Sequence, residues 1–414
     1  MQDLEQGTRT RTSPVYDRGP PPAVRSQGAW CSYSEDSEEY CKGGEVLCQK
    51  PHGLQSAGTT TAACCRRTAV HRDHHHRSSK NLTDCRSLLG KLRIVTGGGR
   101  GIGLALTKEL VRRGAHVVIA TRSAEDIDIE VREQVLRHGR IWPTDEDGDE
   151  LQKDGGGGRG GRGSVEFIRL DLSSFRSVLD FSHKITSRGV HVDVLINNAG
   201  IMAPPARVLT EDGLESQLQV NYLAHFLLTR QLLLKLLGQT QEDPPATAAS
   251  GGQQQKRRPF RVVSLTSSTH HCGNIHFADL NSMEKYHAFH GYTQSKLAVD
   301  IWTKELQRRY REWGVTAVSV HPGLINTPLA RQFFENVVPR RFSGLLRPLF
   351  PLFLNTTAQA VETLMYAVMA PAEEVGGAYV AHAQVSKCGA ICHDLELAAK
   401  LWSVSLSLVP SPPA

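Results

Sequence analysis

The chain has 414 residues, and Lys plus Arg (48) exceed Asp plus Glu (42), which gives a formal net charge of +6 at pH 7. This small basic excess is spread along the chain and does not indicate a nucleic-acid partner. No apolar run is long enough to predict a transmembrane helix, and no pattern typical of a signal peptide is present.

The length allows two or three average domains, but composition favours one domain with additions. Residues 1–88 are rich in Ser, Gly, Arg, Pro and His and lack a sustained apolar period, so we interpret them as a disordered tail. Residues 89–408 alternate between apolar strands and amphipathic helices, which predicts one α/β domain. Low-complexity stretches at 144–163 and 239–259 fall between elements, and we interpret both as loop insertions. The first contains an RGG-like run, for which a flexible loop is favoured over a nucleic-acid contact.

A βαβ unit is predicted at 92–122, where a β-branched strand, a glycine cluster, a helix ending near Gly114 and a second buried strand follow one another. Glycines at the start of such a helix let the backbone approach a pyrophosphate, which the helix N-terminus stabilises. Two further buried strands are predicted in "SVEFIRLDL" and "VDVLINNAG". The pattern predicts a Rossmann-type, doubly wound parallel sheet that binds a dinucleotide.

The second strand ends in Thr121 and Arg122, where an acidic residue would bind the ribose hydroxyls of NAD. Arg100 adds a cation within the glycine turn. Arginine pairs well with a 2′-phosphate, so we expect NADP(H), with NAD(H) less favoured. The alternative is that both arginines are merely solvated.

Tyr292 and Lys296 are spaced i, i+4 in a predicted helix and therefore share one helix face. A nearby ammonium favours the phenolate, so we expect Lys296 to lower the pKa of Tyr292 and make it a proton carrier. A strand that ends in hydroxyl residues precedes the pair, and Asn221 is expected near the start of a long apolar helix. These four polar positions form one candidate catalytic set.

The order of "TGGGRGIG", "NNAG", "YTQSK" and "HPG" resembles the short-chain dehydrogenase/reductase family, over roughly residues 91–401, and "INNAGIM" and "YTQSKLA" resemble its retinol-dehydrogenase-like branch. The resemblance implies a catalytic tetrad of Asn221, Ser267, Tyr292 and Lys296, with Ser268 as the alternative serine. It also implies cofactor contacts from the glycine turn, the strand ends, the catalytic pair and the PG motif: Thr96, Gly97, Arg100, Gly101, Ile102, Gly103, Arg122, Asp171, Leu172, Asn198, Ala199, Gly200, Tyr292, Lys296, Pro322, Gly323 and Thr327. Outside that context, Asp171 would only cap the helix that follows it.

By the same resemblance, we expect an NADP(H)-dependent oxidoreductase that interconverts an alcohol and a carbonyl on a lipophilic substrate, such as a retinoid or a polyprenol-like isoprenoid. The apolar content of 328–354 favours a cover over such a substrate, although packing on the sheet or at a subunit contact is the alternative. Peripheral membrane contact through 342–354 and a homo-oligomer are both compatible with the sequence. The resemblance leaves location open between the endoplasmic reticulum membrane and the cytoplasm. A nucleotide-sensing scaffold or a steroid dehydrogenase are the alternative functions.

No metal site is expected. Two groups are rich in possible ligands, and the first falls in the predicted tail: His71, His74, His75 and His76 with Cys64 and Cys65, and Cys388 and Cys392 with His393. A solvated histidine run and ordinary cysteines are favoured over a metal centre in both.

Overall fold

The computed structural model describes residues 88–122, 133, 139–141, 163–238, 258–325 and 355–411. In this part of the chain, nine strands form one sheet in the order β3-β4-β2-β1-β5-β6-β7-β8-β9. Neighbouring strands are parallel, except for the antiparallel pair β8 and β9. The strands are β1 (Leu92–Thr96), β2 (His116–Thr121), β3 (Gly139–Ile141), β4 (Gly163–Arg169), β5 (Val192–Asn197), β6 (Phe260–Leu265), β7 (Val315–His321), β8 (Tyr379–Ala381) and β9 (Gln384–Ser386).

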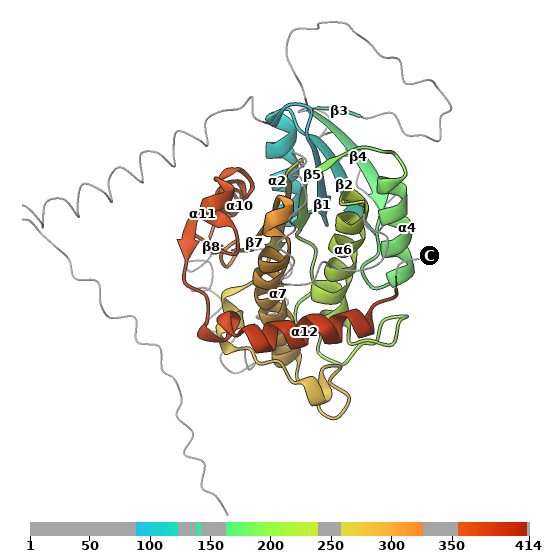
Figure 1. The fold of residues 1–414 in the computed structure, drawn as a ribbon, viewed down its shortest axis with the longest axis vertical. Coiled ribbons are helices and arrows are strands. Elements are labelled where there is room, and N and C mark those ends of the chain that lie inside the picture. Colours follow the sequence, from blue (N-terminus) through green and yellow to red (C-terminus); the bar gives the residue numbers. More distant parts are fainter. Residues whose placement is uncertain are drawn as a thin grey trace, which may run out of the picture. The chain divides into compact units, whose positions relative to one another are not determined.

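Helices cover both faces of the sheet (Figure 1). The α-helices in the described residues are α2 (Gly101–Arg112), α4 (Phe175–Thr186), α5 (Ser216–Leu218), α6 (Ala224–Leu236), α7 (Ala288–Tyr310), α10 (Thr357–Met369), α11 (Ala372–Val375) and α12 (Leu395–Leu408). A π-helical turn, η3 (Gln219–Leu223), joins α5 to α6. Short 3₁₀ turns are η4 (Ser268–Cys272), η5 (Phe277–Asp279), η6 (Arg311–Trp313) and η8 (Ala390–His393).

Two hydrophobic cores result, because successive strand residues point to opposite faces of the sheet. Along β1, Ile94 packs with α4, α6, α7 and α12, whereas Val95 packs with α2, α10 and α11. The central strands are buried on both faces and are rich in Val and Ile, as expected for a parallel sheet between helical layers. The long helix α7 lies against β7, and α12 crosses it (Figure 1).

The strand order reverses at β1, which pairs with β2 on one side and β5 on the other. From β1 the chain first builds outward through β2 and β4, then continues on the opposite side through β5, β6 and β7. In open α/β sheets, ligands bind beyond the carboxyl ends of the strands at such a switch point. The fold therefore predicts a ligand site at the segments that follow Thr96 and Asn197.

The predicted doubly wound parallel sheet is confirmed. Leu88 is buried at the start of the described part, but the rest of the predicted tail lies outside the described residues. So does most of each predicted insertion, together with 328–354. In the part of the chain that can be searched, no helix combines the length and apolar character needed to cross a membrane.

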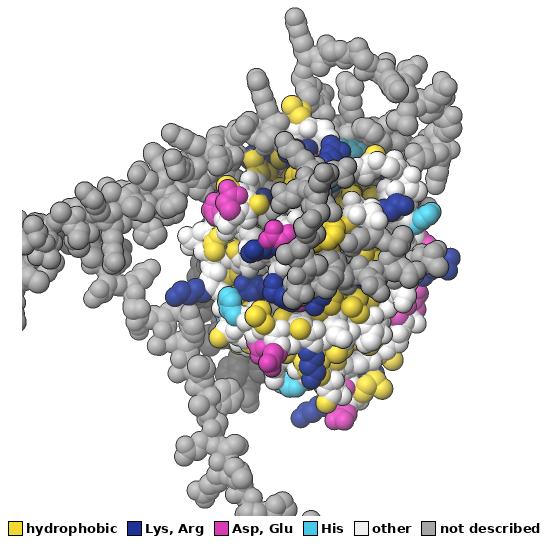
Figure 2. Space-filling model, viewed as in Figure 1, with side chains coloured by type: hydrophobic (Ala, Val, Ile, Leu, Met, Phe, Trp, Pro, Cys, Tyr) yellow, Lys and Arg dark blue, Asp and Glu magenta, His cyan; other side chains and the backbone are white. Residues whose placement is uncertain are grey.

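The described surface carries mixed charge. On the face shown in Figure 2, Lys and Arg side chains are interspersed with Asp, Glu and hydrophobic side chains. This mixture agrees with the small net charge of +6 over the whole chain.

Candidate active site

The turn after β1 is built by close backbone approaches that only glycine permits. Gly97 has φ +65, and its amide donates to the carbonyl oxygen of Ala120 at the end of β2 (2.7 Å). A Cβ on Gly103 would lie 2.3 Å from the Gly97 carbonyl oxygen, so α2 packs against the turn without any side chain between them. Gly101 has φ +54 and open space around its missing Cβ. The turn therefore presents bare backbone at the start of a helix.

The start of α2 suits a phosphate group. Its N-cap residue, Arg100, makes no side-chain capping bond, and the first turn of the helix contains no acidic residue. The first amide groups of a helix lack partners within that helix and carry partial positive charge, which favours an anion. The residues present thus fit a dinucleotide pyrophosphate held by the turn Gly97–Gly103.

The segment after β5 lies directly beside this turn. The Thr96 hydroxyl oxygen accepts from the amides of Asn198 (2.9 Å) and Ala199 (3.0 Å), while the Asn198 side chain donates to the Thr96 carbonyl oxygen (2.7 Å). A Cβ on Gly97 would lie 3.1 Å from Ala199. The predicted cofactor residues of these two segments are therefore brought together, with Thr96 and Asn198 serving as ties between them.

Arg100 lies within the glycine turn and Arg122 directly follows β2, and both side chains are exposed. Because the amide of Gly97 is bonded to Ala120, the end of β2 and the start of α2 are held next to each other. Within the described residues, neither guanidinium has a recorded hydrogen-bond or ion-pair partner. Ile102, the remaining predicted residue of the turn, is half-buried on α2.

Asp171 and Leu172 follow β4. The carboxylate of Asp171 accepts from the amide (2.9 Å) and hydroxyl (2.6 Å) of Ser173, whereas the helix cap of α4 is Ser174. The alternative interpretation of Asp171 as the helix cap is therefore wrong. Leu172 is buried in the core.

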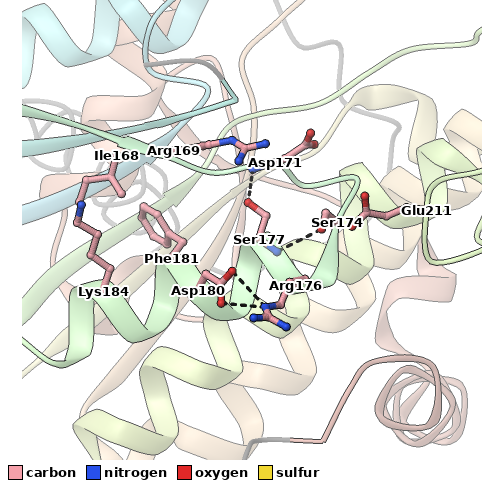
Figure 3. A pocket seen from close by; sticks show the side chains of 10 residues that line it. All are labelled: Ile168, Arg169, Asp171, Ser174, Arg176, Ser177, Asp180, Phe181, Lys184 and Glu211. Atoms are coloured by element: carbon pink, nitrogen blue, oxygen red, sulfur yellow. Dashed lines mark hydrogen bonds and ion pairs between the residues drawn. The ribbon is translucent and has the colours of Figure 1, made fainter. Parts of the chain in front are cut away.

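A hollow of about 410 Å³ lies beside α4 and includes Asp171. Figure 3 shows Asp171 joined to Ser177 and an ion pair between Arg176 and Asp180 on its wall. None of the four expected catalytic residues lines this hollow. It is therefore separate from the proposed site of chemistry.

The PG motif follows β7. Gly323 has φ +88, and a Cβ there would collide with the side chain of Asn355. The main-chain amide of Asn355 donates to the Leu324 carbonyl oxygen (2.6 Å). Pro322 is buried beside it. Thr327, the third residue expected to contact the cofactor here, lies outside the described residues.

Tyr292 lies in the first turns of α7 and is only 5% exposed. Ser267, two residues after the end of β6 at the carboxyl edge of the sheet, lies close enough to the phenol to lower the pKa of Tyr292 against the larger effect of burial. Ser267 is half-buried, whereas Ser268 is exposed. The structure thus brings Ser267, and not the alternative serine, against the phenol.

Lys296 lies one turn after Tyr292, with its ammonium nitrogen 5.8 Å from the centre of the phenol ring. That nitrogen donates to the Leu265 carbonyl oxygen (3.0 Å), and it would lie 3.7 Å from a Cβ on Gly200. Burial lowers the pKa of Lys296 to about 8, and the neighbouring Asp300 opposes this shift. The ammonium thus lies next to Gly200, in the segment after β5 that packs beside the glycine turn.

The expected fall in the pKa of Tyr292 is wrong for the chain as described. Burial raises the pKa of Tyr292 to about 12, although the neighbouring Ser267 acts in the opposite direction. The physical reason is that removing the phenol from water penalises its charged form, and the ammonium is directed to the Leu265 carbonyl oxygen instead of the phenol oxygen. Tyr292 is consequently a protonated phenol at neutral pH.

Asn221 sits within the π-helical turn η3, not in a regular helix as the sequence suggested. Its side chain accepts from the Ile201 amide (2.8 Å) and donates to the Ile201 carbonyl oxygen (3.0 Å) and to Ser295 (3.0 Å). The side-chain oxygen of Asn221 would lie 3.1 Å from a Cβ on Gly200, and the Lys296 ammonium nitrogen would lie 3.7 Å from the same Cβ. Single π-helical turns often occur at functional sites. All four expected catalytic side chains thus lie in one neighbourhood.

Comparison with known proteins agrees with this geometry. A family model described as short chain dehydrogenase matches residues 91–150, 143–243 and 272–337. Retinol dehydrogenase 13 of Mus musculus is 35% identical over 323 residues, which cover 77% of this chain and 84% of that protein. Polyprenol dehydrogenase of Danio rerio is 33% identical over 335 residues, covering 80% and 90% of the two chains. The crystal structure of an uncharacterised protein from Mycobacterium paratuberculosis matches with a TM-score of 0.54 and 28% identity, covering 80% of this chain and 98% of that one.

The chain belongs to the short-chain dehydrogenase/reductase family. Within it, the matches place the chain in the retinol-dehydrogenase-like branch. It is accordingly an oxidoreductase that acts on CH–OH groups with a nicotinamide dinucleotide of the NAD(H)/NADP(H) class.

Two buried residues of this short-chain dehydrogenase were missed from the sequence, although each has a helical spacing that could have indicated it. His225 follows Asn221 by four residues, and its ring joins Thr96 (3.0 Å) to the Asn221 carbonyl oxygen (3.3 Å). Burial lowers the pKa of His225 to about 3, so the ring is neutral. It links the glycine turn to the turn that carries Asn221.

Asp300 follows Lys296 by four residues and is fully buried. It accepts from Thr266 (2.6 Å), whose hydroxyl oxygen also lies 3.1 Å from the Lys296 carbonyl oxygen. Burial raises the pKa of Asp300 to about 7, against the effects of the neighbouring Ser319 and Thr266 hydroxyls. A carboxyl group that titrates near neutrality thus lies behind Lys296.

Among the described residues, no group of three or more His, Cys, Asp or Glu side chains is arranged to hold a metal ion. The histidine run at 71–76 lies outside them.

Proposed function

We propose that the chain reduces a lipophilic aldehyde or ketone to an alcohol, and catalyses the reverse oxidation, with NADP(H) as its coenzyme and a tetrad of Asn221, Ser267, Tyr292 and Lys296. The observation that carries the proposal is the contact of the buried Tyr292 hydroxyl with Ser267 beside Lys296. This group of side chains adjoins Gly200, which follows the segment packed on the glycine turn.

Tyr292 is the proton donor in the reductive direction. Because burial holds the pKa of Tyr292 at about 12, the phenol is protonated at neutral pH and can donate to an alkoxide that forms on the substrate. Ser267 orients the substrate oxygen toward the phenol. The Lys296 ammonium favours the phenolate that remains after proton transfer, since an opposite charge nearby stabilises the ionised form.

Asn221 holds the chain in place around Lys296. Its side chain fixes both main-chain groups of Ile201, the residue after Gly200. A bound nicotinamide would supply or accept the hydride. The chain contributes placement of the reacting groups, a proton, and exclusion of water around a phenol that is 5% exposed.

The preference for NADP(H) is supported by Arg100 and Arg122. Both are exposed beside the glycine turn, and β2 ends without an acidic residue that would repel a 2′-phosphate. Replacing Arg122 with Ala should lower kcat/KM for NADPH by about 10- to 100-fold, because a hydrogen bond to a charged group contributes about 1.5–3 kcal/mol. The value for NADH should stay nearly constant.

Arg112 provides a matched control for that measurement. It lies at the other end of α2 and pairs with Glu109 (2.8 Å), so Arg112→Ala should leave the ratio of NADPH to NADH use unchanged. An equal loss with both coenzymes in the Arg122 variant would contradict the proposed preference.

The proposed substrate class is supported by the relatives, which include retinol dehydrogenases and a polyprenol dehydrogenase. The half-buried Ile201 and Met202 also extend from Gly200 past Asn221. Transfer of labelled hydride from NADPH to retinal, a polyprenal and a steroid ketone, measured side by side, tests the assignment. Fastest transfer to the steroid would favour a steroid dehydrogenase, and NADPH binding without transfer to any carbonyl would favour a nucleotide-sensing scaffold.

Contact with a membrane surface through 342–354, location at the endoplasmic reticulum and assembly into a homo-oligomer accompany this proposal. The apolar composition of that segment supports the membrane contact. Flotation of the full chain with phosphatidylcholine vesicles would test that contact, and sedimentation of the vesicle-free protein would test the homo-oligomer.

A further inference from the structure

Two thiols and an imidazole meet between β9 and α12, outside the tetrad. The sulfur of Cys388 lies 3.2 Å from Nε2 of His393, and the Cys392 side chain is a near neighbour of Cys388. The 3₁₀ turn η8 brings them together, since the amide of Cys392 donates to the Gly389 carbonyl oxygen (3.0 Å). Cys388 is half-buried, whereas Cys392 is 2% exposed.

The surroundings make the two thiols unequal. The Cys392 thiol lowers the pKa of Cys388, and the positive charges of Lys304 and His393 act in the same direction, whereas burial opposes them. The neighbouring Cys388 and burial both raise the pKa of Cys392. A thiolate with a protonated, less accessible thiol beside it is the arrangement of an attacking and a resolving cysteine.

We propose that Cys388 and Cys392 form a peroxide-reactive pair that closes reversibly to a disulfide. The Cys388 sulfur attacks one oxygen of the peroxide and the O–O bond breaks, which leaves a sulfenic acid on Cys388 and releases hydroxide. The Cys392 sulfur then attacks the Cys388 sulfur, the S–S bond forms and the S–O bond breaks. The departing hydroxide takes the Cys392 proton as water, so two electrons pass from the thiols to the peroxide. A dithiol reductant then reduces the disulfide to the two thiols and is itself oxidised to a disulfide.

The pair is connected to Ser267 through one histidine. The amide of Gly389, the residue after Cys388, donates to Nε2 of His270 (3.2 Å), and Nδ1 of His270 donates to the Ser267 carbonyl oxygen (2.8 Å). These two contacts are compatible with a single neutral tautomer, and burial lowers the pKa of His270. Closing the disulfide would change the turn at Gly389 and hence the position of Ser267. This consequence rests on the proposed role of Ser267, whereas the thiol chemistry does not.

The test uses the full chain and hydrogen peroxide. After treatment and alkylation of the remaining thiols, cleavage after Lys387 and Lys400 releases both cysteines in one peptide. The expected product is that peptide lighter by two hydrogens, restored by dithiothreitol. The exposed Cys272 serves as the internal control, and Cys388 should react with peroxide and with iodoacetamide about tenfold faster than Cys272 at pH 7.

Single variants separate the two roles. Cys392→Ser should stop at a sulfenic acid on Cys388 that dimedone traps, whereas Cys388→Ser should leave Cys392 reduced. His393→Gln should slow alkylation of Cys388, because the imidazolium no longer favours the thiolate. A peptide that stays reduced while Cys272 is oxidised, or equal rates for the two cysteines, would overturn the proposal.

NADPH-dependent turnover by the oxidised and reduced chain gives the second measurement. Loss of turnover on oxidation that dithiothreitol restores, and that is absent in Cys388→Ser, supports the link through His270. Unchanged turnover beside a formed disulfide overturns that link alone. If no carbonyl is reduced by the untreated protein, the proposed function fails, but the peptide result still decides the thiol chemistry.

Discussion

The two ends of the proposed coenzyme site are built in opposite ways. At the glycine turn, α2 approaches β1 so closely that a single methyl group on Gly103 would meet the Gly97 carbonyl oxygen at 2.3 Å. At the other end, α7 brings buried polar side chains, Tyr292, Lys296 and Asp300, to the carboxyl edge of β6 and β7. One end works through the absence of side chains and the other through their charge states.

This contrast determines how each end responds to change. Backbone amides at a helix N-terminus do not titrate near neutral pH, so the glycine turn should bind phosphate over a wide pH range. Lys296 and Asp300 have pKa values of about 8 and about 7, respectively, so the other end changes its charge close to neutrality. Turnover should therefore depend on pH more strongly than coenzyme binding does.

The largest effect is expected from removing the phenol oxygen. Tyr292→Phe should lower kcat by about 10²- to 10⁴-fold, because a positioned proton donor contributes that much. Coenzyme binding, measured by fluorescence titration of NADPH, should remain close to that of the wild type. Tyr310→Phe is the matched control, since Tyr310 is buried near the other end of the same helix. Comparable activity in the two variants would show that the phenol of Tyr292 carries no proton in the reaction.

Replacing Ser267, at the same end of the proposed site, is expected to have a smaller effect on catalysis. Ser267→Ala should lower kcat/KM by about 10- to 100-fold, the range for a hydrogen bond of about 1.5–3 kcal/mol to an oxygen that gains charge. Ser268→Ala should leave it unchanged, because the Ser268 side chain is exposed. A loss in Ser268→Ala but not in Ser267→Ala would assign the catalytic role to Ser268 instead.

At the glycine turn, an added methyl group should act on packing before it acts on chemistry. Gly103→Ala should reduce the free energy of unfolding by about 1–3 kcal/mol, the range for overpacking, and weaken NADPH binding as α2 moves from the turn. Gly101→Ala is the matched variant, since open space surrounds that Cβ and only the positive φ opposes it, by about 1 kcal/mol. Urea denaturation measures both. Equal losses would mean that the approach of α2 to Gly97 is not what limits the turn.

The same contrast explains what the sequence could and could not predict. The glycine turn could be predicted from the sequence, because its steric requirements for Gly97, Gly101 and Gly103 are local to one βαβ unit. The i, i+4 spacing also placed Tyr292 and Lys296 together. The pKa of Tyr292 could not be read in this way, since it depends on burial by elements far along the chain.

Other features required the fold itself. The π-helical turn at Asn221 and the strands β3, β8 and β9 have no distinct local signal. The contact of Asp300 with Thr266 joins residues 34 positions apart, across the end of β6. Such long-range polar contacts are selected by packing and not by any short pattern.

The smallest effect is expected at the buried charges, from replacing Asp300, and it concerns the pH dependence of kcat. Asp300 becomes ionised as the pH rises through about 7, and its negative charge raises the pKa of Lys296. Asp300→Asn removes this negative charge, so Lys296 should release its proton at a lower pH. The alkaline fall in kcat should shift downward by less than about one pH unit, which corresponds to about 1 kcal/mol.

Stability provides an independent check on the same carboxyl group. Because its folded pKa is raised from 3.8 to about 7, its contribution to stability is fully present below pH 3.8 and is lost as the pH rises through about 7. The unfolding free energy of the wild type minus that of Asp300→Asn should therefore decrease over this interval, as measured by urea denaturation at several pH values. A constant difference would place the carboxyl in a more polar environment than its full burial implies, and the shift in the kcat profile should then be absent as well.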